Sequence, residues 1–138
     1  MKIKQAQAPG RITSLDYILG FSTLEEVIET VQRFNIQHKG SRNPNGKEGG
    51  ILIEAKDGDM YRKYRPQVKS IAEEILKVLK KYNIDSWEGG IRNHCPIFLH
   101  SFDEKSVKEW HTLGTNLPRN QLLEQSTFKD RSLVEYAK

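Results

Sequence analysis

The amino-acid sequence predicts an α/β fold in which parallel strands alternate with helices. Two short apolar runs, residues 51–56 and 96–100, have the composition of buried strands, and segments with helical spacing of apolar residues precede, separate and follow them. This alternation predicts parallel strands joined by right-handed crossovers. Two architectures fit it, an open doubly wound sheet and a TIM (β/α)8 barrel. In both, functional residues gather at the carboxyl ends of the strands.

The first helix is predicted at residues 23–35. Its apolar residues recur at the spacing of one helical face, and they are Leu24, Val27, Ile28, Val31 and Phe34. Two capping boxes fit the start of this helix, one formed by Ser22 with Glu25 and the other by Thr23 with Glu26. Either box would satisfy backbone N–H groups that have no partner in the first helical turn.

The strand at 51–56 carries charge at its C-terminal end. Because side chains alternate along a strand, Glu54 and Lys56 project from the same face as Leu52. The opposite face carries Ile51, Ile53 and Ala55. Burying a charge is costly unless it is paired or bound to a metal. Glu54 and Lys56 therefore indicate either a functional site or an ion pair where the strand end reaches solvent.

The longest predicted helix spans residues 66–82, with Pro66 in its first turn, where proline is well tolerated. Glycine and polar residues predict loops at 36–50 and 84–95. Residues 1–20 have a turn signal and a short apolar patch, and we expect them to form a lead-in segment.

The remaining elements continue the alternation. The strand at 96–100 precedes a helix at about 104–113, for which Asp103 is the predicted cap. A third short strand is predicted at 121–123. A last helix is expected to start at Asp130, with Leu133, Val134 and Ala137 as its apolar residues.

Composition narrows the class of protein. With 22 basic and 18 acidic residues, the net charge is +4, and the charges are mixed along the chain, which does not favour a nucleic-acid partner. No apolar run is long enough to predict a transmembrane helix. The single cysteine, Cys95, excludes an internal disulfide framework. Although it follows His94, no second cysteine stands at metal-ligand spacing, so the prediction is a buried or incidental thiol.

Several segments, in the same order, resemble the glycerophosphodiester phosphodiesterase family of metal-dependent TIM-barrel hydrolases. Phe21–Val27 resembles the start of a family helix with the sequence Thr-Leu-Glu-Glu. Ile53–Lys56 resembles the family's strand motif Ile-Glu-Ile-Lys, and Leu99–Asp103 resembles a later strand that ends in Ser-Phe-Asp/Asn. The helix at 71–82 and the strand at 120–123 fit as well. The resemblance covers roughly residues 12–138.

The resemblance implies a function and a set of site residues. Glu54 would be a ligand of a divalent cation, Ca²⁺ or Mg²⁺, since hard cations prefer carboxylate oxygens. Lys56 would contact the substrate phosphate, and Phe102 would line the substrate pocket. The substrate would be a small-molecule glycerophosphodiester, which water splits into glycerol 3-phosphate and an alcohol such as choline or ethanolamine.

The chain departs from the family pattern in one major respect. The family's His-Arg motif, its Glu-x-Asp motif and its second histidine followed by aspartate are all absent from this sequence. We therefore assign no catalytic residue. A full barrel takes about 250 residues, so we expect residues 21–138 to form a partial phosphodiesterase domain, completed by a missing barrel half or by a homodimer.

Two other interpretations fit the sequence. The chain could be a non-catalytic half-barrel that binds a phosphorylated ligand or a protein partner through Lys56 and nearby basic residues. It could also be a small flavodoxin-like domain that matches the family by chance, although such a fold needs five strands and three are predicted.

Overall fold

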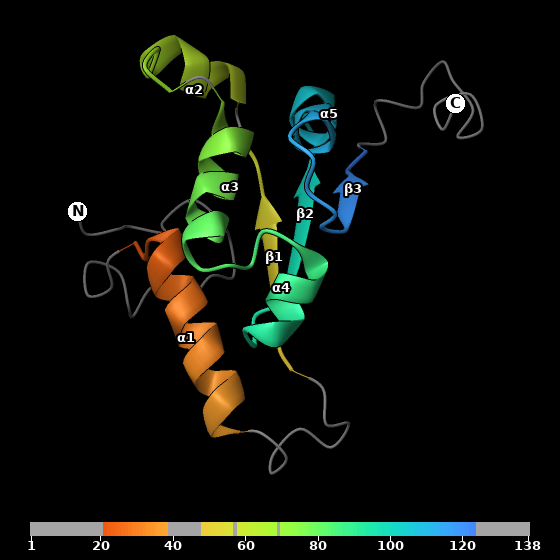
Figure 1. Ribbon diagram of the computed structural model, residues 1–138. Helices are drawn as coiled ribbons and strands as arrows, with labels where there is room; N and C mark the ends of the chain where they lie inside the picture. The colour runs from red at the N-terminus through yellow and green to blue at the C-terminus, as the bar shows by residue number, and fades with distance from the viewer. Residues whose placement is uncertain (1–20, 39–47, 57, 69, 124–138) are drawn as a thin grey trace, which may run out of the picture.

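The computed structural model describes residues 21–38, 48–56, 58–68 and 70–123, with the exception of the side chains of residues 61 and 62. Helices and strands alternate along most of this part of the chain (Figure 1). In chain order the elements are α1 (Leu24–Gln37), β1 (Ile51–Glu54), α2 (Gly58–Tyr64), α3 (Ile71–Lys81), α4 (Trp87–Arg92), β2 (Ile97–Ser101), α5 (Glu104–Thr112) and β3 (Arg119–Gln121).

The three described strands form one parallel sheet in the order β1-β2-β3, which confirms the predicted α/β class and the parallel pairing. In the register of β1 and β2, Ile51 lies opposite Ile97 and Glu54 lies opposite His100. Each strand therefore lies beside the next one in sequence, as successive β/α units require. Three strands in this order fit an open sheet as well as a barrel, so the partial TIM barrel stays a prediction.

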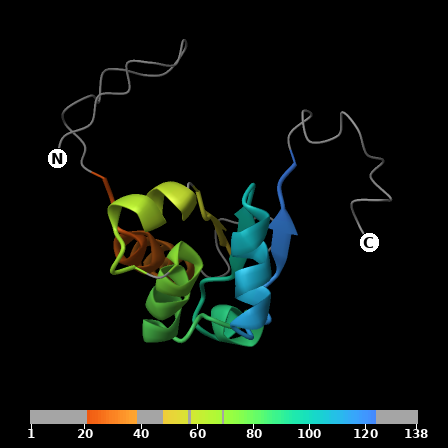
Figure 2. The same ribbon diagram turned by 90° about the horizontal axis from the view of Figure 1, so that it is seen from above.

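Helices α3 and α5 pack against each other and cover one face of the sheet (Figure 2). Toward this face point the buried side chains Ile53, Ala55, Ile97 and Leu99. The core between sheet and helices also holds Trp110 of α5, whose indole N–H donates to the carbonyl of Ala72 in α3 at 3.2 Å. This hydrogen bond satisfies the only polar atom of the Trp110 side chain, while its ring fills the space between the two helices.

The opposite face of the sheet is largely exposed within the described structure, and we call it the uncovered face. It carries Leu52, Glu54, Lys56, Phe98, His100 and Phe102. Leu52 is 60% exposed and Phe102 is 50% exposed. The Phe98 ring is contacted edge to face by Trp87 of α4, with 5.4 Å between ring centroids. Since parallel sheets ordinarily have both faces covered, this face is the natural place for further structure or a ligand.

Most predicted elements are present, with shifted ends. The Thr23–Glu26 capping box begins α1, and the Ser22–Glu25 register is wrong. The helix predicted at 66–82 begins only at Ile71, because the Ser70 side chain accepts a hydrogen bond from the backbone N–H of Glu73 and so caps the helix there. Pro66 lies outside this helix.

Two short helices, α2 and α4, were not predicted from the sequence. Helix α2 covers much of the stretch that follows β1, and α4 lies inside the predicted loop at 84–95. Ser86 caps α4 by accepting from the N–H of Gly89 at 3.0 Å. Both glycines of α4 are buried, and a Cβ on Gly90 would approach the carbonyl oxygen of Cys95 to 3.0 Å. Close packing therefore explains why a helix can contain the glycine pair that suggested a loop.

The third strand lies two residues earlier than the predicted 121–123. It comprises the polar residues Arg119–Gln121, because the backbone of β2 offers them ladder partners. The backbone N–H of Leu122 still donates to the carbonyl of Ser101 at 2.8 Å. The lead-in segment 1–20 and the helix predicted from Asp130 lie outside the described residues.

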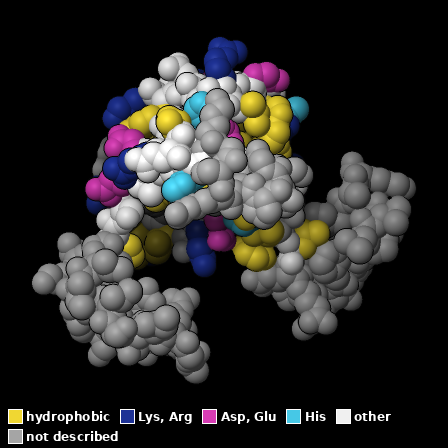
Figure 3. Space-filling view, turned by 90° about the horizontal axis from the view of Figure 1, so that it is seen from below, with side chains coloured by type: hydrophobic (Ala, Val, Ile, Leu, Met, Phe, Trp, Pro, Cys, Tyr) yellow, Lys and Arg dark blue, Asp and Glu magenta, His cyan; other side chains and the backbone are white. Residues whose placement is uncertain are grey.

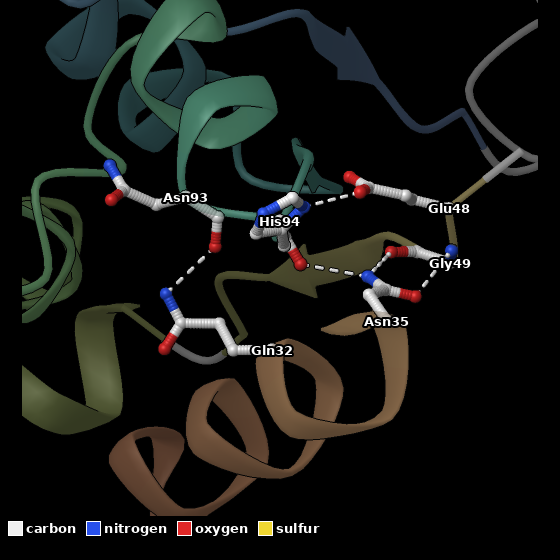
Figure 4. Close-up of polar contacts among 6 residues, drawn as sticks. All are labelled: Gln32, Asn35, Glu48, Gly49, Asn93 and His94. Carbon is white, nitrogen blue, oxygen red and sulfur yellow. Dashed lines mark hydrogen bonds and ion pairs between the residues drawn. The ribbon is translucent and has the colours of Figure 1, made fainter. Parts of the chain in front are cut away.

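Helix α1 is fastened at the end of the sheet where the strands begin, which we call the amino end (Figure 4). The buried Asn35 side chain donates to the carbonyls of Gly49 and His94 at 2.8 and 2.7 Å, and its oxygen accepts from the N–H of Gly49 at 3.0 Å. The His94 ring pairs with Glu48. One amide side chain thus joins α1 to the entry of both β1 and β2.

Further contacts hold α1 along its length. The Gln32 side chain donates to the carbonyl of Asn93 at 3.0 Å. Beyond the end of α3, the hydroxyl of Tyr82 donates to Glu29 of α1 at 2.7 Å, and this hydrogen bond raises the pKa of Tyr82 to about 12.

Seen from the amino end, the surface of the protein shows hydrophobic side chains in several separate groups among charged ones (Figure 3).

We predict that Asn35→Ala lowers the free energy of unfolding by about 3 kcal/mol, because it removes three hydrogen bonds through which a buried side chain joins α1 to Gly49 and His94. The matched control is Gln32→Ala, which removes one part-buried hydrogen bond and should cost no more than about 1 kcal/mol. Urea unfolding followed by circular dichroism measures both. Equal losses for the two variants would contradict the assigned role of Asn35.

Candidate functional site

A cleft of about 430 Å³ lies where β1 and β2 end, and we call it the carboxyl-end cleft. Its chemically important lining residues are Glu54, Lys56, Asp59, Met60, Phe102 and Asp103. The structure therefore brings together all three site residues that the sequence indicated, Glu54, Lys56 and Phe102. Asp59, Met60 and Asp103 had no predicted binding role.

Backbone contacts hold the two strand ends side by side. The N–H of Ala55 donates to the carbonyl of His100 at 3.0 Å, which extends the pairing beyond β1. The fully buried Ser101 hydroxyl donates to the carbonyl of Ala55 at 2.6 Å and accepts from the N–H of Asp103 at 2.9 Å. Ser101 thereby fixes the segments that carry Lys56 and Phe102 relative to each other.

Asp103 caps helix α5, as predicted. One carboxylate oxygen accepts from the backbone N–H of Lys105 at 3.1 Å, and the other accepts from the hydroxyl of Ser106 at 2.9 Å. Both oxygens are therefore engaged in starting the helix, although the carboxylate keeps its negative charge at the wall of the cleft.

Glu54 and Lys56 are exposed, and within the described part of the chain neither forms a hydrogen bond or an ion pair. The interpretation as a strand-end ion pair is therefore wrong for these two residues. What remains is a carboxylate and an ammonium group that both face the carboxyl-end cleft. Such groups are available to a ligand without first breaking an internal contact.

The described residues do not by themselves fit a resident divalent cation. Ca²⁺ takes six to eight oxygen ligands and Mg²⁺ takes six. Among the residues that the structure describes, no three His, Cys, Asp or Glu side chains come close enough together to hold a metal ion. Glu54 as a metal ligand therefore stays a prediction from the resemblance, and we derive no metal-dependent step from it.

Three of the four histidine rings contact other side chains and do not line the carboxyl-end cleft. His94 pairs with Glu48 at the amino end of the sheet. The Nδ1 atom of His111 lies 2.8 Å from the guanidinium of Arg119, so it accepts a hydrogen bond from that group. The ring of His38 lies against the ring of Phe34 in a tilted arrangement, with 4.5 Å between the ring centroids. The fourth, His100, lies on the uncovered face opposite Glu54, as its place at a strand end predicts.

Comparisons with protein-family models, with curated proteins and with solved structures gave no match. No helix in the described ranges is long and apolar enough to cross a membrane. The fold and the cleft therefore define a class, an α/β protein with a polar site at the carboxyl edge of a parallel sheet. The resemblance in the sequence is the basis for any finer proposal.

Cys95 is fully buried, as the sequence indicated, and burial together with the nearby Glu48 carboxylate raises the pKa of its thiol to about 11. We predict that a thiol reagent fails to label Cys95 in the folded protein and labels it readily in guanidinium. Rapid labelling of the native protein would contradict this burial.

The raised pKa of Cys95 also predicts how stability depends on pH. Between pH 9.0 and about 11 the folded thiol keeps a proton that the unfolded chain loses, so the free energy of unfolding falls as the pH rises.

Proposed function

We propose that the chain is part of a glycerophosphodiester phosphodiesterase, and that its carboxyl-end cleft binds the phosphodiester substrate. The observation that supports this most is the convergence of Glu54, Lys56 and Phe102 on one cleft. The resemblance assigns these three residues to the site, and they come from two strand ends that lie far apart in the sequence.

The position of the cleft also favours the proposal. In barrels and in open parallel sheets, ligands bind at the carboxyl ends of the strands. The side chains of Glu54 and Lys56 project from the uncovered face, which in a barrel would be the interior. A barrel whose remaining strands covered this face would enclose Glu54 and Lys56 at its mouth.

Each residue has a physical role in this proposal. The ammonium group of Lys56 would attract the diester phosphate and offset the charge that develops during hydrolysis. Phe102, which is half exposed, would pack against the organic part of the substrate. Glu54, which the resemblance implies as a ligand of a divalent cation, would contribute a carboxylate at the same cleft. The products would be glycerol 3-phosphate and an alcohol.

A second candidate function is binding without hydrolysis. It is favoured by the missing family histidines, because general acid–base catalysis needs a positioned proton carrier. It is also favoured by the lack of a metal-holding group among the described side chains. In this alternative Lys56 would hold a phosphorylated ligand, and the uncovered face would remain a surface for a partner.

We predict that Lys56→Met weakens the binding of glycerophosphocholine roughly tenfold to a hundredfold, the loss expected for a hydrogen bond to a charged group. Lys108→Met is the matched control, because Lys108 lies on α5, pairs with Glu104 and does not line the cleft. Isothermal titration calorimetry measures both affinities. Equal binding by the two variants would contradict a phosphate contact at Lys56.

Hydrolysis separates the two candidate functions. Release of choline from glycerophosphocholine in the presence of Ca²⁺ or Mg²⁺, abolished in Glu54→Gln, is the result expected of the enzyme. Binding that depends on Lys56 without any release is the result expected of the non-catalytic module.

A further inference from the structure

We propose that the uncovered face of the sheet binds the same face of a second copy of this chain. Its apolar side chains reach solvent, because Leu52 is 60% exposed, Phe98 is 37% exposed and Phe102 is 50% exposed. Helices α3 and α5 cover only the other face (Figure 2). Parallel sheets ordinarily have both faces covered, and adjacent exposed apolar side chains mark contact surfaces. The proposal involves no ligand and is independent of the function proposed above.

Three polar side chains of this face form a row across the strands. Glu54 of β1 lies opposite His100 of β2, and His100 lies opposite Asn120 of β3. Residues opposite each other in a parallel ladder project from the same face of the sheet. Within the described part of the chain, none of these three side chains forms a hydrogen bond or an ion pair. The row therefore has a free carboxylate at one edge, a free amide at the other and an imidazole ring between them.

The polar row is complementary to itself, and this favours a second copy over an unrelated partner. A two-fold axis that runs along β2, between two sheets packed face to face, places Glu54 of each copy opposite Asn120 of the other. The amide N–H groups of Asn120 then donate to the carboxylate of Glu54 twice, once on each side of the axis. The two His100 rings meet at the axis, where one ring can donate and the other accept. The interface of a two-fold symmetric dimer needs this kind of self-complementarity.

The same axis brings apolar side chains together. Leu52 lies opposite Phe98 in the register, two residues nearer the amino end than the polar row. Because Phe98 belongs to β2, the Phe98 rings of the two copies meet at the axis, each supported edge to face by Trp87. An axis along the strands also keeps both carboxyl-end clefts at the same end of the dimer. Since a carboxylate accepts several hydrogen bonds, the contact with Asn120 leaves Glu54 able to face its cleft.

The test is sedimentation velocity of the full chain without ligand, at about 5 to 500 µM, because the face of three short strands is small for a tight dimer. The mass should rise with concentration from that of one chain toward that of two. Leu52→Asp should weaken the dimer at least about tenfold, because it buries a charge among apolar side chains. Phe34→Asp is the matched control, since Phe34 is 57% exposed on α1 and lies outside the uncovered face, and it should leave the dimer unchanged.

An exchange of charge tests the position of the axis. Asn120→Asp sets two carboxylates opposite each other and should weaken the dimer at least about tenfold. Adding Glu54→Gln to that variant restores one amide opposite one carboxylate and should return the affinity to near its original value. Both side chains are exposed, so circular dichroism should show the same fold in the single and the double variant.

A chain that stays monomeric over the whole concentration range overturns the proposal. The rate at which a thiol reagent labels Leu52→Cys then identifies the true occupant, because the native Cys95 is buried. Slow labelling shows that other residues of the same chain cover the face, and fast labelling shows a face open to a different protein. A dimer that resists both Leu52→Asp and Asn120→Asp, or that Phe34→Asp weakens equally, also overturns the proposal, because its contact then lies elsewhere.

Discussion

The parallel pairing of β1 with β2 is the constraint on which the rest of the described structure depends. The register that places Ile51 opposite Ile97 sends the apolar side chains of both strands into the helical layer. Because side chains alternate, the same register sends Leu52, Glu54 and Phe98 to the uncovered face. A slip of one residue would exchange these two sets and bury a carboxylate against Trp110 and its neighbours.

The polar groups at the two ends of the sheet differ in what they bind. At the amino end, Asn35 and the pair formed by His94 and Glu48 join α1 to the loops that enter the strands. These groups satisfy one another. At the carboxyl end, Ser101 fixes the backbone, while Glu54 and Lys56 have no partner among the described residues. Polar groups that bond to one another indicate a structural role, whereas exposed charged groups without a protein partner that gather at a cleft indicate a place for a ligand.

Much of this arrangement could be predicted from the sequence, because periodicity reports directly on burial. The alternation around Ile53 placed Glu54 and Lys56 on one face, and the order of elements predicted parallel strands. The start of α3 could not be placed, since Pro66 and Ser70 are both good helix starts and tertiary packing selected Ser70. Strand β3 has no apolar pattern of its own and exists through its pairing with β2. Asp59 and Met60 reached the site through a helix that local sequence did not reveal.

The central claim is that ligands bind at the carboxyl-end cleft on the uncovered face. The most direct test is a ¹H–¹⁵N NMR titration of the protein with glycerophosphocholine. We predict that the amide resonances of Glu54, Lys56, Phe102 and Asp103 shift with a common saturation curve, while those of Asn35 and Gly49 at the amino end stay in place. Shifts confined to the amino end, or none anywhere at saturating ligand, would contradict the account.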